Sequence, residues 1–164
     1  ELGSNVIRWI MLSTHYRAPL NVNEETIETA KTELAKIQTS LTQAYVKLGL
    51  AKVTIKEELV EEAYAPFLEA MQDDLNTPNG FKALFDANKQ LNSVIRHREI
   101  DMELLGRYVY TMQKMLKVLG IVIEEVKLDN KDIELFDKWN EAKKAKDFDH
   151  ADVYRGKLQE RGLL

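Results

Sequence analysis

The chain has 164 residues, of which 45% are hydrophobic and 30% charged, and these values predict one globular domain, or one domain with a small appendage. Its formal net charge of −4 argues against a broadly basic nucleic-acid surface, and the absence of cysteine excludes disulfides, thiolate metal sites and a cysteine nucleophile. Because no signal segment and no membrane-spanning apolar run is present, we expect a cytoplasmic protein without a membrane partner.

The first apolar segment, residues 4–13, predicts a short and well-buried helix after a possible cap at Ser4. His15, Tyr16 and Arg17 follow, and Pro19 places them on a connecting loop. Two interpretations stay open for these three side chains. They either contact an RNA backbone and stack on a base, or they pin the loop to the helices.

The middle of the chain predicts four long helices. Apolar residues recur at spacings of three and four from 24 to 48, from 60 to 71, from Pro78 to about 96 and from about 101 to 119. Asn23 is a candidate N-cap and Gly49 a candidate left-handed C-cap, while Gly120 marks the end of the last of these helices. Short links between such helices favour an all-α fold, an up-and-down antiparallel helical bundle with a small helical C-terminal appendage.

A helix-helix corner is predicted between the second and third of these helices. Thr77 has the residue type of an N-cap and Pro78 falls at the first helical position, while Asp73, Asp74 and Asn76 supply acceptors and negative charge at the helix's positive end. The alternative is a metal or catalytic site on the two carboxylates. No His or third carboxylate lies at ligand spacing, so we interpret these residues as a structural cap and expect no metal.

The tail begins after residues 121–127, which read as a linker or a stray strand. Ile133, Phe136 and Trp139 indicate one helix, and Phe148, Ala151, Tyr154 and Leu158 indicate a last one that ends at Gly162. We expect Phe148, Ala151 and Leu158 to hold these two helices together. Residues 131–164 carry eight basic and eight acidic residues, so the negative balance lies in the rest of the chain. The candidate RNA-contacting residues of this tail are Lys143, Lys144, Lys146 and Arg155. A solvated helix face with mixed charge is the alternative.

No catalytic constellation is found in the sequence: it has no Gly-rich phosphate loop, no nucleophile elbow and no metal-ligand spacing. Three blocks in order nevertheless resemble the C-terminal part of a cysteinyl-tRNA synthetase. They are residues 6–9 with 13–21, residues 71–78 with 83–85, and residues 140–148 with Ala151, Asp152, Arg155, Leu158 and Gly162.

The resemblance implies a class I synthetase that joins cysteine to tRNA(Cys) with ATP. It implies that the catalytic domain, with its ATP motifs and zinc site, precedes this region, so no cofactor is expected here. The implied partners are tRNA(Cys) and the catalytic domain of the same chain, and not DNA. Departures from the family are Leu75 in place of the usual Phe, Gly156 in place of an acidic residue, and the lack of the final strand.

The resemblance also implies a division of the chain. Residues 1–22 resemble the end of a stem-contact region, 23–126 an anticodon-binding-type helical bundle of the DALR type, and 127–164 the truncated start of a small anticodon-recognition domain. Two other functions stay open at this point. One is a helical protein-interaction scaffold, and the other is the C-terminal region of the paralogous ligase that joins cysteine to an amino sugar.

Overall fold

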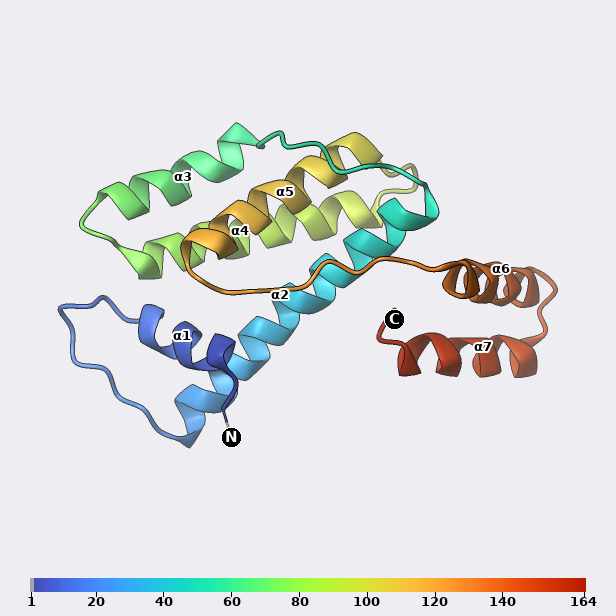
Figure 1. Cartoon of the computed structure of the whole chain (residues 1–164), viewed down its shortest axis with the longest axis horizontal. Coiled ribbons are helices and arrows are strands. Elements are labelled where there is room, and N and C mark those ends of the chain that lie inside the picture. The colour runs from blue at the N-terminus through green and yellow to red at the C-terminus, as the bar shows by residue number, and fades with distance from the viewer. Residues whose placement is uncertain (1) are drawn as a thin grey trace.

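The computed structural model describes residues 2–164, which form seven helices and no strand (Figure 1). The helices are α1 (Ser4–Leu12), α2 (Glu24–Leu50), α3 (Glu61–Gln72), α4 (Thr77–Arg96), α5 (Met102–Val118), α6 (Asn130–Lys144) and α7 (Phe148–Glu160). The predicted all-α class is therefore confirmed. None of these seven helices is both long enough and apolar enough to cross a lipid bilayer.

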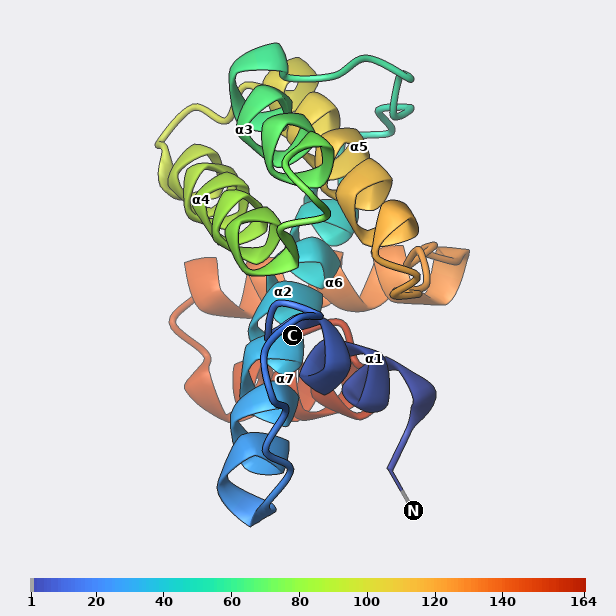
Figure 2. The same ribbon diagram turned by 90° about the vertical axis from the view of Figure 1, so that its left-hand side faces the viewer.

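Helices α2 to α5 run in alternating directions and form the predicted antiparallel bundle, with α1 beside the first half of α2 (Figures 1 and 2). Helices α6 and α7 pack against each other as a hairpin near the C-terminal end of α2. We call this unit, residues 130–160, the hairpin. It is the small helical appendage that the sequence predicts.

The bundle core is continuous with α1. Trp9 is 1% exposed, and its ring lies 4.5 Å from that of Phe81 and 6.0 Å from that of Phe85. Its indole Nε1 donates a hydrogen bond of 2.8 Å to Glu33 on α2. The prediction of a well-buried first helix is wrong for its outer face, because Ile7 is 45% exposed. The predicted boundary between residues 22 and 23 stays a prediction.

Several helix ends follow the sequence signals. Asn23 caps α2 in a capping box with Thr26, and Gly120 adopts the left-handed conformation (φ 69°) after α5. Gly49 is different, because α2 continues through it to Leu50 and the left-handed residue is Lys52 (φ 55°). The prediction of a left-handed C-cap at Gly49 is therefore wrong.

The corner between α3 and α4 is capped one residue earlier than predicted. The side chain of Asn76 accepts a hydrogen bond of 3.3 Å from the backbone N–H of Asn79, so Asn76 is the N-cap and Thr77 the first helical residue. Asp74 and Leu75 are both left-handed, with φ values of 52° and 53°. In this turn the backbone N–H of Asn76 donates a hydrogen bond of 2.9 Å to the Ala70 carbonyl, which holds Asn76 at the N-cap position.

The segment after α5 is a linker, since no strand occurs among residues 2–164. It leads to a second core, which joins the hairpin to α2. The buried members of this second core are Val46, Phe136, Leu158 and Leu163, and partly buried residues packed on it include Leu50, Leu128 and Trp139.

Candidate nucleic-acid interface

The loop after α1 is fastened to the acidic corner between α3 and α4. The Tyr16 hydroxyl donates a 2.7 Å hydrogen bond to Asp74, and Arg17 Nη2 lies 3.0 Å from the other oxygen of this carboxylate. His15 stacks on Tyr16, with ring centroids 4.8 Å apart. The loop after α1 and the α3–α4 corner therefore form one surface feature. Its contacts agree with the interpretation in which these side chains pin the loop to the helices.

The Asp74 carboxylate also acts on Tyr16, because accepting the hydroxyl's hydrogen bond favours the neutral phenol and raises its pKa. The Arg17 side chain is 70% exposed and that of Asp74 is 47% exposed, so their ion pair adds little stability. RNA contact by His15, Tyr16 and Arg17 stays a prediction. If Arg17 binds a phosphate, that phosphate must compete with Asp74.

The predicted basic residues of the tail are all exposed. Lys143 and Lys144 end α6, Lys146 lies in the turn with φ 57°, and Arg155 is on α7. The Lys143 ammonium is 3.4 Å from the centroid of the Trp139 ring, a cation–π contact. Its pKa is lowered because burial, and then the neighbouring charge of Lys47, disfavour the protonated form.

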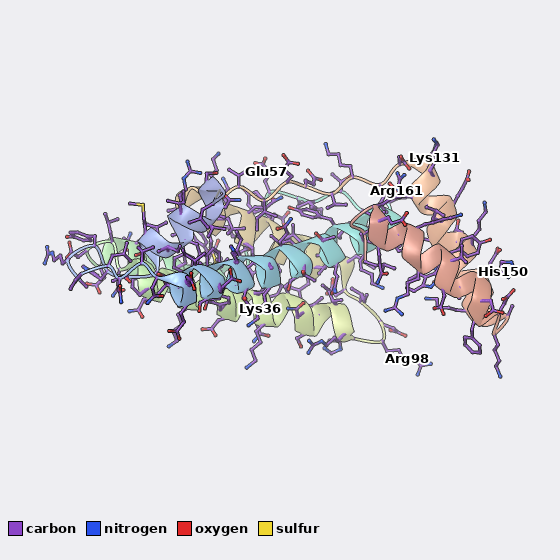
Figure 3. The ribbon with its side chains drawn as sticks, turned by 90° about the horizontal axis from the view of Figure 1, so that it is seen from below. Lys36, Glu57, Arg98, Lys131, His150 and Arg161 are labelled. Atoms are coloured by element: carbon purple, nitrogen blue, oxygen red, sulfur yellow. The ribbon has the colours of Figure 1, made fainter. Side chains whose placement is uncertain are left out.

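Phe148 corrects one prediction and gives the tail a second exposed aromatic group. Ala151 and Leu158 are buried between α6 and α7, as expected, but Phe148 is 69% exposed. The reason is its position, because Phe148 begins α7 just after the cap at Asp147, at the tip of the hairpin and away from the second core. Figure 3 shows this tip, where His150 lies beyond the rest of the molecule.

A polar network that we did not predict closes the other end of the hairpin. Asp129 and Asp132 form a capping box at the start of α6, and Arg161, just past α7, donates hydrogen bonds to both carboxylates (3.0 Å to Asp129). Asp132 is only 4% exposed. Backbone N–H groups that donate to Asp129, chiefly that of Asp132, hold its pKa below the ordinary value, and Arg161 adds to this.

Sequence offers one signal for this network, the two aspartates at capping-box spacing, but it does not show that Arg161 reaches them. Because Arg161 is engaged by two carboxylates, it belongs to the fold of the hairpin and not to its free basic surface. Figure 3 places Arg161 and Lys131 together at the end of the hairpin nearest the bundle.

Charge is distributed unevenly over the two faces of the molecule. Residues 57–81 include seven acidic residues and no basic residue. About half of this segment is α3, which lies on the side of the bundle away from α1 and α7 (Figures 1 and 2). A polyanion is repelled by such a surface, so the α3 side is the least suited to nucleic acid.

No catalytic or metal-binding arrangement was predicted for this chain. Among residues 2–164, no three His, Asp or Glu side chains lie close enough together to hold a metal ion. The described surface offers exposed ammonium and guanidinium groups and exposed aromatic rings, which are groups that bind phosphates and stack on bases.

Comparison with known proteins identifies relatives along the whole chain. Residues 66–124 match the DALR domain family. The cysteine–tRNA ligase of Oceanobacillus iheyensis is 36% identical over 167 residues, which cover 97% of this chain and 36% of that protein. The cysteine–tRNA ligases of Halalkalibacterium halodurans and Geobacillus sp. strain WCH70 are 32% and 31% identical, over 99% and 100% of this chain and 36% of each relative. The chain thus spans about a third of the length of the curated relatives it matches.

Proposed function

We propose that this chain is the tRNA-binding C-terminal region of a cysteine–tRNA ligase, because it is similar over its whole length to about a third of such ligases. The parent protein would join cysteine to tRNA(Cys) with ATP in the cytoplasm. ATP and zinc would be bound by a catalytic domain outside these residues, which would be this region's partner within the same chain. The relatives favour this function over a protein-interaction scaffold or an amino-sugar ligase.

The observation that carries the proposal is the composition of the hairpin tip. Lys144 and Lys146 are exposed there beside Phe148, an aromatic residue that is 69% exposed. Sequence-specific RNA recognition uses unpaired bases, which stack on aromatic side chains while basic groups contact the phosphates. A projecting tip that combines both groups suits a single-stranded loop of tRNA better than a duplex.

The remaining basic candidates extend this surface along the hairpin. Arg155 lies on α7 and is exposed, and Lys143 is held above Trp139 at the end of α6. The partly buried Trp139 fixes the Lys143 ammonium in one place, which reduces the entropy lost when a phosphate binds. The acidic α3 side would orient bound RNA, because it repels the phosphates and leaves the hairpin side for RNA to approach.

A salt series of tRNA binding tests the proposal. Fluorescence anisotropy of labelled tRNA(Cys) should give a dissociation constant in the range of about 10⁻⁴ to 10⁻⁶ M at physiological salt. Replacing Lys143 and Lys144 by Ala should weaken binding and reduce the slope of log K against log salt by about 1 to 2. The matched control replaces Lys82 and Lys89, two exposed lysines of α4, and should retain the parent's slope. Equal binding by the parent and the Lys143/Lys144 variant would remove the hairpin from the proposed interface.

A further inference from the structure

The linker that carries the hairpin touches α2 most closely at a glycine. A methyl group placed on Gly49 would lie 3.1 Å from Leu128 Cδ1 and 3.2 Å from Leu128 Cγ. Leu128 directly precedes Asp129, the N-cap of α6. The distance between the linker and α2 is therefore set two residues before the hairpin begins.

Rotation of the Leu128 side chain about χ2 cannot relieve this contact. Such a rotation moves the two Cδ atoms but leaves Cγ in place, and Cγ is itself only 3.2 Å from the position of the added methyl group. A change of χ1 would withdraw Leu128 from the second core, on which it packs. A Cβ at residue 49 therefore requires Leu128 to shift by a few tenths of an ångström, and the linker backbone carries that shift where packing in the second core holds χ1.

Close approach is the reason that this structure gives for a glycine at position 49. The residue is helical, within the last turn of α2, where alanine is the better helix former and no positive φ requires glycine. Gly106, within α5, is a useful contrast. A methyl group there would be 3.9 Å from its nearest neighbour, an ordinary contact.

Few other contacts between α2 and the hairpin constrain the angle of the hairpin. The buried part of the second core includes only one residue of α2, Val46, and it includes three that lie on or just after the hairpin helices. A cavity of about 290 Å³ opens beside this contact, between the linker, α2 and the loop after α2, and Gly49 and Leu128 line it together with Tyr45, Ile55 and Val126. The linker is thus packed tightly at Gly49 and loosely beside it.

We propose that Gly49 is a positioning residue, whose missing side chain sets the angle of the hairpin and so aims its RNA-contacting tip. The inference rests on the proposed function for its consequence in RNA binding. Helix α6, with 15 residues, is about 22 Å long. This length is roughly six times the 3.8 Å between adjacent Cα atoms. When the hairpin pivots at the residue next to Leu128, a displacement of a few tenths of an ångström at Leu128 is amplified about sixfold, to about 1 to 2 Å at the tip.

The experiment measures hairpin orientation and RNA binding on the same variants. The chain has no cysteine, so spin labels can be attached uniquely after Lys36→Cys on α2 and Asp149→Cys near the hairpin tip; both positions are exposed. Gly49→Ala is the test substitution, and Gly106→Ala is the matched glycine-to-alanine control in a bundle helix. In the rescue variant, Gly49→Ala is combined with Leu128→Ala, which leaves only a Cβ, 3.8 Å from the added methyl group.

Gly49→Ala should shift the distance between the labels by about 1 to 2 Å and weaken tRNA binding about threefold to tenfold, as expected when one or two phosphate contacts are misplaced. Thermal unfolding of the bundle should not move downward, because alanine is the better helix former. The rescue variant should return the distance to that of the parent, and Gly106→Ala should alter neither quantity.

The inference is overturned if Gly49→Ala leaves the distance unchanged, if Gly106→Ala shifts it equally, or if the distance shifts while tRNA affinity stays that of the parent. Failure of the proposed function has a different signature, since the unsubstituted chain would then show no salt-dependent binding of tRNA. In that case the distance measurements still decide whether Gly49 sets the hairpin angle. The proposed role of Gly49 in directing the tip toward RNA would then be rejected.

Discussion

Phe136→Ala should release the hairpin from α2 while the bundle stays folded. Phe136 is 3% exposed and is the largest of the four buried residues of the second core. Replacing a buried Phe by Ala costs about 3 to 5 kcal/mol. The Phe136 ring also lies 6.2 Å from that of Trp139 at 59°, a geometry worth about 0.5 to 1.5 kcal/mol beyond burial. Three buried aliphatic residues remain, too few to hold two helices in place.

Native-state hydrogen exchange measures this effect helix by helix. In Phe136→Ala, amides of α6 and α7 should lose protection by the full 3 kcal/mol or more estimated above, while those of α2 to α5 keep theirs. Phe148→Ala is the matched control on the same hairpin, because its ring is 69% exposed and its loss should cost less than about 0.5 kcal/mol. Equal loss of protection in bundle and hairpin would refute the reasoning, since it would mean that the two cores unfold as one unit.

Three further tests probe local features of the fold. Asn76→Ala should cost about 0.5 to 1 kcal/mol in denaturant melts through the lost cap, and Thr77→Ala less; the reverse order would contradict the cap that the structure shows. Thr111→Val should cost about 1 to 3 kcal/mol, because the buried Thr111 hydroxyl accepts a backbone N–H at 2.9 Å; a neutral melt would contradict this role. Backbone N–H groups lower the pKa of Asp129 and Asp147 from 3.8, so their stabilisation is complete above about pH 3.8 and is lost as the pH falls through the lower folded values. NMR signals of the hairpin should therefore weaken on acidification, and stronger signals would be the opposite result.

The helices were predictable because apolar spacing reports burial directly. The seam from Ile27 to Leu48 gave α2 within two residues, and Asn23 and Gly120 gave helix ends, since caps are local interactions. The prediction for Gly49 was wrong for a physical reason. A glycine serves either a left-handed cap or a close approach, and only the position of Leu128 separates the two.

The candidate interface was less predictable, because its contacts join distant parts of the chain. Arg17 pairs with Asp74 across 57 positions, and Arg161 with Asp132 across 29, and no local pattern reports such pairs. Phe148 follows the helical spacing of Ala151 and Leu158, yet it is exposed, since periodicity assigns a face and does not show where the covering element ends.

The most direct test of the central claim is an NMR titration of the chain with tRNA(Cys), followed through its backbone amides. We expect the largest shifts on the hairpin, at Lys144, Phe148 and Arg155, and none on the acidic helix α3. Shifts centred on α3, or spread evenly over the bundle without the hairpin, would contradict the proposal that this region binds tRNA through its C-terminal helices.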